Sequence, residues 1–112
     1  MGGFMKGDVV VVSFPFSDLS SSKRRPALVV AKGSERDLIL AQITSKAFRD
    51  AYAIELTSDN FVSGGLHLLS YARPNKIFTA EAGIILYKLG CLKPEKMNEV
   101  VSAIIGLLSP DS

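Results

Sequence analysis

Short runs of β-branched and other apolar residues, separated by turn-forming residues, occupy most of the chain. The run GDVVVVSFPF (7–16) predicts a strand from Asp8 to Phe14, bounded by Gly7 and Pro15. Apolar side chains lie on both faces of this run, so we expect the strand to be buried on two sides. Similar runs predict further strands at 26–33, 37–45, 51–56, 67–72 and 76–80.

The segments between these runs carry turn chemistry. SERD (34–37) predicts a hairpin connection, and RPN (73–75) predicts a turn between two short strands. TSDNFVSGG (57–65) predicts a single helical turn followed by a loop. IILYKLG (84–90) fits either a strand or the approach to a helix, and its pattern does not choose between them.

The last element is predicted to be a helix. Pro94 suits a first helical turn, Glu95 is a favourable charge there, and Pro110 ends the element. One helical face carries the apolar residues Met97, Val100, Val101, Ile104 and Leu108. Five to seven short strands with one main helix predict a mostly β fold, a small antiparallel barrel covered by a C-terminal helix.

The composition is that of one globular domain spanning residues 1–112, with 47% hydrophobic and 21% charged residues. No apolar run reaches the roughly 18 residues that a membrane helix needs, and no signal pattern opens the chain, so we expect a cytoplasmic protein without membrane association. The mean hydropathy of +0.26 is high for so small a domain and favours a homodimer.

The chain has a single cysteine, Cys91, and a single histidine, His67. Neither a disulfide framework nor a zinc-binding spacing is present, and we expect no metal or other cofactor. Cys91 lies in an apolar stretch and is interpreted as a small buried side chain. His67 could act as a general base, but as one residue in a glycine-rich loop it is interpreted as an ordinary surface histidine.

The positive charge is unevenly distributed. The net charge is only +2, which excludes a broadly cationic nucleic-acid coat. Residues 1–56 hold eight Lys or Arg against six Asp or Glu, whereas residues 57–112 hold five of each. The excess includes three adjacent cations, Lys23, Arg24 and Arg25, so an anion site is expected to be local and to lie there.

A hairpin of the second and third strands would bring several polar residues together. Arg25 precedes Pro26, which favours an extended Arg25 with its guanidinium held in a defined direction. Thr44 and Ser45 end the third strand, next to Lys46. In a hairpin these residues and Arg25 lie at the same end of the pair, near the loop that contains Ser20, Ser21 and Ser22.

This set of residues suits a phosphate group, because arginine binds phosphate oxygens in bidentate fashion and hydroxyls add neutral donors. It also suits cleavage of RNA, in which the substrate supplies its own 2′-OH nucleophile and the protein supplies charge stabilisation and proton transfer. The alternative interpretation is structural: a solvated strand edge, an ordinary Arg-Pro turn and common strand-end hydroxyls. From the residues alone both interpretations remain open.

The order of these motifs resembles the MazF/PemK-type toxins of toxin–antitoxin modules. GDVVVVSFPFSDLSSSKRRPALVVA is similar to the opening of that family, and LAQITS to its second signature around a strand-end threonine. YARPNKIFTAEAGIILYKLGCLKPEKMNEVVSAIIGLL is similar to the C-terminal half of the PemK-like branch. The resemblance covers nearly all of the chain and is weakest over residues 47–66.

The resemblance implies an SH3-like barrel of the CcdB/PemK type, usually a homodimer, that cleaves single-stranded RNA, often mRNA, at short sequences without metal. The products would be a 2′,3′-cyclic phosphate and a 5′-OH, and a cognate antitoxin would inhibit the enzyme. It implies that Arg25 is a catalytic phosphate clamp and proton donor to the leaving 5′-oxygen, and that Thr44 stabilises the phosphate oxygens. The RNA-binding residues would be Ser20, Ser21, Ser22, Lys23, Arg24, Ser45 and Lys46.

The chain also departs from the family in its loop, where Leu-Ser-Ser-Ser-Lys replaces a common Gly-Ser-Glu-Gln, and Arg24 could share the role of Arg25. Residues considered as base contacts are Phe14, Phe16, Phe48, Tyr52 and Arg73. The alternative function is a non-catalytic binding module on the same barrel, either a gyrase-targeting CcdB-like protein or a degenerate toxin that binds only RNA or an antitoxin. The Arg-Pro and Ile-Thr-Ser motifs favour the enzyme.

Overall fold

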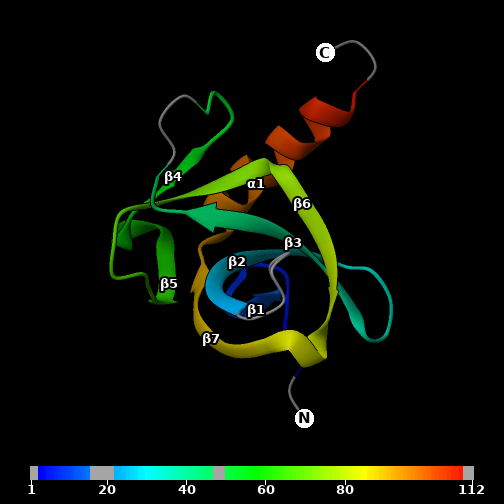
Figure 1. Ribbon diagram of the computed structural model, residues 1–112. Helices are drawn as coiled ribbons and strands as arrows, with labels where there is room; N and C mark the ends of the chain where they lie inside the picture. The colour runs from blue at the N-terminus through cyan, green and yellow to red at the C-terminus, as the bar shows by residue number, and fades with distance from the viewer. Residues whose placement is uncertain (1–2, 16–21, 47–49, 110–112) are drawn as a thin grey trace.

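The computed structural model describes residues 3–15, 22–46 and 50–109, which form a strongly bent sheet followed by an α-helix (Figure 1). The strands are β1 (Asp8–Pro15), β2 (Ser22–Lys32), β3 (Asp37–Thr44), β4 (Ile54–Leu56), β5 (Phe61–Gly64), β6 (Ser70–Glu81) and β7 (Ile85–Leu92). Short 3₁₀ turns, η1 (Ser58–Asn60) and η2 (Ala82–Ile84), precede β5 and β7. The helix is α1 (Pro94–Leu108).

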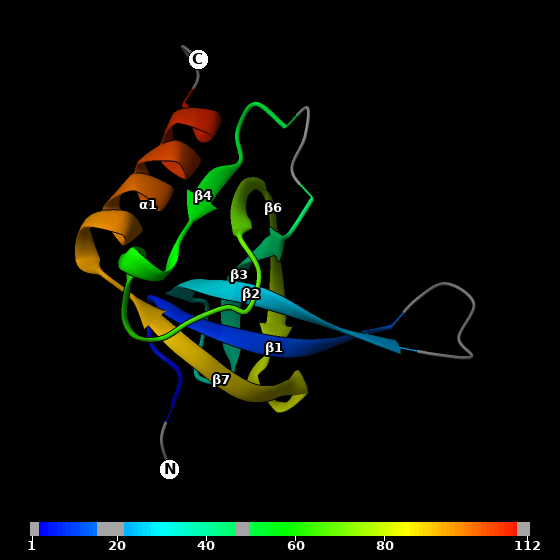
Figure 2. The ribbon, with the colours of Figure 1, turned by 90° about the vertical axis from the view of Figure 1, so that its left-hand side faces the viewer.

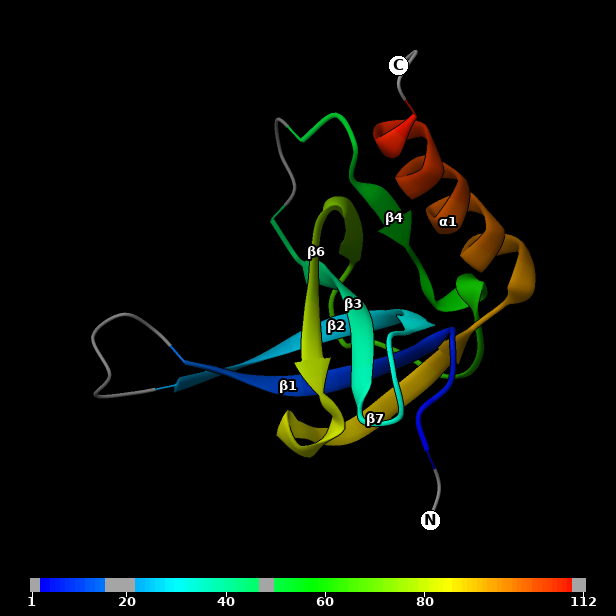
Figure 3. The same ribbon diagram turned by 90° about the vertical axis from the view of Figure 1, so that its right-hand side faces the viewer.

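The strands belong to one antiparallel sheet with the order β4-β6-β3-β2-β1-β7-β5. The sheet curls into a half-barrel, and α1 lies beside β4 on one side of it (Figures 2 and 3). This architecture confirms the predicted mostly β fold with a C-terminal helical cover.

β1 is buried on both faces, as the apolar residues on both of its faces predicted. Val9 packs into one hydrophobic cluster with Met97 of the helix. Val10 and Val12 point to the opposite face, where they pack into a second cluster with Leu40. Burying an apolar side chain of this size stabilises a fold by about 1.5–3 kcal/mol. β1 therefore joins two small cores that lie on opposite faces of the same sheet.

The helix begins at Pro94, as expected, and its apolar stripe is only partly buried. Met97 and Val100 lie in the core, Val101 and Ile104 are half-buried, and Leu108 is 72% exposed. The last turn of α1 lines a shallow pocket together with Pro74 and Ile77 of β6, and this contact leaves Leu108 largely exposed.

The turn predicted at 73–75 is wrong, because β6 continues through it. The ladder between β3 and β6 skips from Arg73 to Ile77 with a shift of register. Pro74 lies in the skipped segment, where its missing N–H costs no ladder hydrogen bond. The residues expected to turn the chain instead form an irregularity that bends a long strand.

The strand predicted at 51–56 begins only at Ile54. The side chain of Asp50 accepts a hydrogen bond from the Tyr52 N–H at 3.0 Å, and the Asp50 carbonyl accepts one from the Ala53 N–H at 3.2 Å. These contacts close a turn over residues that have strand-like composition, because an aspartate side chain competes with ladder pairing.

The loop predicted after η1 contains a further strand, β5, which pairs with β7. Of the undecided stretch 84–90, Ile84 ends η2 and the other residues are part of β7. The two strands approach closely at Gly64, which has a φ of +69°, and Gly90, where an added Cβ would lie 2.5 Å from the Ser63 carbonyl oxygen. Glycine at both positions lets the backbones meet, a tertiary requirement that local sequence patterns do not reveal.

Candidate functional site

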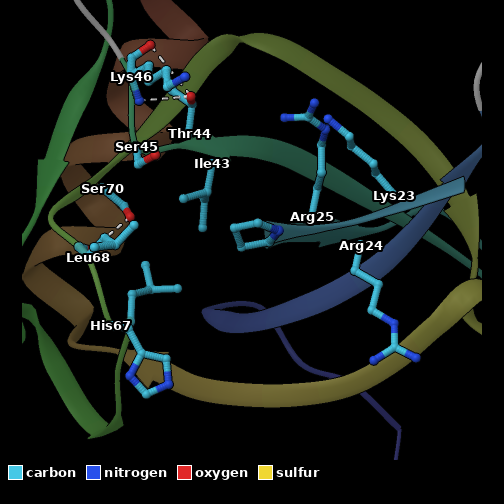
Figure 4. A pocket seen from close by; sticks show the side chains of 12 residues that line it. Lys23, Arg24, Arg25, Ile43, Thr44, Ser45, Lys46, His67, Leu68 and Ser70 are labelled. Carbon is cyan, nitrogen blue, oxygen red and sulfur yellow. Dashed lines mark hydrogen bonds between the residues drawn. The ribbon is translucent and has the colours of Figure 1, made fainter.

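A cavity of about 490 Å³ opens beside the β1–β2 hairpin (Figure 4). Its walls come from the start of β2, the end of β3 and the segment that joins β5 to β6. The lining residues are Lys23, Arg24, Arg25, Pro26, Ile43, Thr44, Ser45, Lys46, Leu66, His67, Leu68 and Ser70.

The first wall exists because β2 extends farther than β3. β2 begins at Ser22 rather than at the predicted residue 26, and its first residues pair with β1. The ladder to β3 begins only at Ala27, opposite Gln42, one residue after Pro26, which has no N–H to offer. The β1–β2 hairpin therefore projects from the half-barrel (Figures 2 and 3), and one edge of β2 is left open to the cavity.

The register of the β2–β3 pair brings Arg25 and Thr44 to the same level. Ala27 faces Gln42, so continuing the antiparallel register places Arg25 opposite Thr44. Both residues were expected at the same end of a hairpin, and both line the same cavity.

Side chains alternate along β2, which separates the cationic residues. Lys23 and Arg25 project to one side of the strand and Arg24 to the other (Figure 4). All three are exposed. Arg24 therefore lies on a different side of β2 from Arg25, and a shared role at one phosphate is disfavoured.

The charged side chains among the described residues that line the cavity are all positive. Lys46 adds a further cation at the end of β3, and no Asp or Glu is found among the described residues that line the walls. Clustered arginine and lysine side chains attract anions and give phosphate oxygens their strongest donors. The lining therefore fits a polyanionic ligand.

The hydroxyl of Thr44 has a defined local position. Its Oγ1 accepts the Lys46 N–H at 3.0 Å and donates to the Lys46 carbonyl at 3.5 Å, which is long for a hydrogen bond. This strand-end turn holds the oxygen in place. The weak donor interaction leaves the hydroxyl hydrogen available to a stronger acceptor, such as a phosphate oxygen.

The second wall comes from residues 65–69, which connect strands that are far apart in the sheet. β5 forms one edge of the sheet and β6 lies near the other edge, so the connection must cross the open end of the half-barrel. The Gly65 N–H donates to the Leu89 carbonyl at 3.2 Å, and Ser70 Oγ donates to the Leu68 carbonyl at 2.9 Å. This crossing places His67 and Ser70 in the cavity.

His67 was weighed as a possible general base from the sequence, but the interpretation as an ordinary histidine was preferred. Ser70, which is buried, was not considered. The available signals were weak: a single histidine in the chain, and polar residues within the apolar stretch GLHLLS.

Several predicted residues cannot be placed in the cavity. Ser20 and Ser21 lie outside the described residues, and Ser22 is described only as the first backbone position of β2. Phe16 and Phe48 also lie outside them, as does the side chain of Phe14. The prediction of a serine-rich RNA-binding loop therefore stays a prediction.

Arg73 and Tyr52, considered as base contacts, do not line the cavity. Arg73 Nε donates to Asp50 Oδ2 at 2.7 Å, and the Asp50 side chain is only 8% exposed. Burial alone would raise the pKa of the Asp50 carboxyl, but hydrogen bonds from the Tyr52 N–H and the Arg73 guanidinium lower the pKa below its ordinary value of 3.8. Arg73 therefore anchors the chain before β4.

Neither a metal centre nor a membrane span is found in the described part of the chain. It contains no cluster of three or more His, Cys, Asp or Glu side chains that could hold a metal ion. None of its helices has the length and hydrophobicity needed to cross a membrane.

Comparison with solved structures relates this fold to toxins and nucleases. An endoribonuclease bound to its cognate antitoxin, from a mycobacterial species, has a TM-score of 0.71 at 18% identity and covers 98% of this chain and 100% of its own. The MazE–MazF complex from Deinococcus radiodurans has a TM-score of 0.73 at 20% identity, with coverages of 92% and 93%. The Mycobacterium tuberculosis toxin MazF-mt6 has a TM-score of 0.65 at 16% identity, with coverages of 87% and 93%.

Comparison of the sequence with protein families is more specific than these structural likenesses. No curated protein sequence matches the chain. A family described as the PemK-like, MazF-like toxin of type II toxin–antitoxin systems matches residues 5–108. Because this match covers nearly the whole chain, the protein belongs to the PemK-like, MazF-like family of toxins of type II toxin–antitoxin systems.

Proposed function

We propose that the protein is a metal-independent endoribonuclease toxin that cleaves single-stranded RNA, including mRNA, at short sequence motifs. The observation that carries this proposal is the cavity in which Arg25 and Thr44 lie together among cations, with no carboxylate among its described lining residues. Membership of the toxin family and the likeness in fold to endoribonucleases from mycobacteria support it.

In the proposed reaction the 2′-OH of the substrate attacks the adjacent phosphorus, and the products are a 2′,3′-cyclic phosphate and a 5′-OH. Arg25 binds the phosphate oxygens in bidentate fashion, neutralises the charge that develops on the phosphorane and donates a proton to the leaving 5′-oxygen. The Thr44 hydroxyl donates to a phosphate oxygen and orients it. Both groups come from paired strands, which limits their movement.

The remaining predicted residues are proposed to bind RNA rather than to take part in bond cleavage. Lys23, Arg24, Ser45 and Lys46 contact neighbouring phosphates along the cationic wall, because polyanion binding rests on such charges. Ser20, Ser21 and Ser22 are proposed to contact the RNA from the loop before β2.

The proposed partners are a cognate antitoxin and a second copy of the chain. Antitoxin complexes of proteins with the same fold support the first. Exposed apolar side chains on α1, including Ile105 at 59% and Leu108 at 72%, support a homodimer that covers them. We place the action of this single domain, residues 1–112, in the cytoplasm, where its mRNA substrate is made and translated.

The test is incubation of the purified protein with a long single-stranded RNA in the presence of EDTA, followed by analysis of the product ends. We expect discrete cleavage with 2′,3′-cyclic phosphate and 5′-OH ends, and no cleavage at a site whose 2′-OH is replaced by hydrogen. RNA binding without cleavage under all conditions would instead identify a non-catalytic binding module. Cleavage that requires a divalent ion would overturn the proposed chemistry.

A further inference from the structure

His67 lines the same cavity as Arg25 and Thr44, although it comes from the segment that joins β5 to β6 (Figure 4). The segment that carries it is held on both sides, by the hydrogen bond from Gly65 to Leu89 and by the one from Ser70 to Leu68. The histidine itself is exposed to the cavity and to solvent. Its position is therefore defined, and its imidazole is accessible to a ligand.

The cavity has the size of sites that hold small ligands, which measure about 300–1,000 Å³. Leu66, His67 and Leu68 lie on a different wall of the cavity from the cationic residues of β2. If the phosphate of a nucleotide bound to the β2 wall, its ribose, which carries the 2′-OH nucleophile, would be the part nearer to His67.

Transesterification of RNA needs a group that takes the proton of the 2′-OH, and the cavity offers few candidates. Lysine and arginine ordinarily keep their protons up to about pH 10 or higher, and hydroxyls are very weak bases. Imidazole changes its charge between about pH 5 and 8. Besides His67, the polar side chains that the structure describes in the lining belong to those weaker classes: Lys23, Arg24, Arg25, Lys46, Thr44, Ser45 and Ser70.

We propose that His67 is the general base of the RNA cleavage proposed above, an inference that rests on that function. A ring nitrogen of His67 accepts the 2′-OH proton while the 2′-oxygen forms its bond to phosphorus. The bond between phosphorus and the 5′-oxygen breaks, and the leaving oxygen takes a proton from Arg25. The imidazolium then releases its proton to water, Arg25 regains one, and the net reaction transfers one proton from the 2′-oxygen to the 5′-oxygen.

Replacing the histidine by an amide gives the first test. His67→Gln is expected to lower the single-turnover rate constant about 10²–10⁴-fold, the usual contribution of a positioned general base. The wild-type rate should rise with pH, because a general base must be deprotonated to act, and His67→Gln should lose this rise. The charged groups that line the cavity with His67 are Lys23, Arg24, Arg25 and Lys46. Leu69→Ala, an exposed neighbour outside the cavity lining, is the matched control and should keep the wild-type rate and pH profile.

Two further measurements distinguish proton transfer from a structural role. His67→Gly should regain cleavage when free imidazole is added, with a rate that follows the basicity of substituted imidazoles. In a substrate with sulfur at the bridging 5′ position the leaving thiolate needs no proton. The defect of His67→Gln should therefore persist with this substrate, whereas the defect of Arg25→Ala should shrink.

Each outcome has a distinct meaning. Absence of cleavage by the wild-type protein overturns the proposed function itself. Wild-type cleavage that His67→Gln leaves unchanged in rate and pH dependence overturns the inference about His67 alone. Lost activity with a retained pH rise and no rescue by imidazole also overturns it, as does a defect that disappears with the sulfur-containing substrate.

Discussion

The chain places an arginine directly before a proline inside two strands, and the two pairs have different surroundings. Arg25 and Pro26 lie in β2, where the arginine is exposed in a cavity whose described lining contains no carboxylate. Arg73 and Pro74 lie in β6, where the arginine donates to Asp50 at 2.7 Å. The proline has the same local effect in both, since it favours an extended arginine.

The charged neighbours, rather than the Arg-Pro dipeptide, therefore set the role of each arginine. Arg73 already has a carboxylate partner, and its ion pair holds the turn before β4 in place. Arg25 faces hydroxyls and other cations, and this environment favours an anionic ligand.

The largest effect is expected on RNA cleavage when Arg25 is replaced, with replacement of Arg73 as the comparison. Arg25→Ala should lower the single-turnover rate constant about 100–1,000-fold, because removal of one preorganised donor to a developing anion costs that much. Arg73→Met should leave the rate constant of the folded protein unchanged. Circular dichroism serves as the folding control, and equal loss in both folded variants would contradict the assignment.

A second prediction gives Arg25 a carboxylate neighbour of the kind that Arg73 has. Thr44→Asp puts a carboxylate beside Arg25, which should occupy the guanidinium, repel phosphate and lower cleavage as strongly as Arg25→Ala does. Thr44→Val keeps the shape and removes only the hydroxyl, so the loss should be smaller, about tenfold for one neutral hydrogen bond. Cleavage assays on both variants check this order, and full activity in Thr44→Asp would exclude a phosphate at this position.

The third prediction concerns stability. Asp50→Asn removes the charge that Arg73 faces, and we expect the free energy of unfolding to fall by about 1–3 kcal/mol, as for the loss of a charged hydrogen bond in a partly buried site. Arg25→Ala should change it by less than about 0.5 kcal/mol, as for an exposed side chain. Urea denaturation near neutral pH measures both values, and the opposite order would contradict the comparison.

The smallest effect is the pH dependence of that stability. The folded pKa of Asp50 is lowered below 3.8, so unfolded chains bind more protons than folded ones just below that pH. The contribution of the ionised Asp50 is fully present above pH 3.8 and is lost as the pH falls through the folded pKa. The difference in unfolding free energy between wild type and Asp50→Asn should therefore shrink in acid. A difference that stays constant down to pH 2 would show that the carboxylate charge does not carry it.

Elements with strong local patterns were predicted well. The β-branched run of β1, the apolar runs of β2 and β3, and the amphipathic α1 each carry enough apolar residues at one period to identify the element. Prediction failed where contacts with a particular side chain or strand set the backbone conformation. The examples are the turn that Asp50 closes, the close approach of Gly64 to β7, and the irregularity at Pro74.

The candidate site likewise combines residues whose proximity the sequence could predict with residues whose proximity it could not. Arg25 and Thr44 could be predicted together because two consecutive strands form a hairpin, and the register of a hairpin follows from its connection. His67 and Ser70 could not, because their distance from Arg25 along the chain says nothing about their position in space. Their place depends on β5 joining the far edge of the sheet.

Local sequence patterns were enough to predict the mostly β fold, its closing helix, the local excess of cations and the resemblance to the toxin family, since these depend on neighbouring residues and their spacing. The folded structure was needed to show that Arg24 points away from Arg25, that Arg73 forms an ion pair with Asp50, and that His67 lies in the cavity. These relations depend on how the sheet curls and which strands form its edges, and that is set by the packing of two cores on opposite faces of β1.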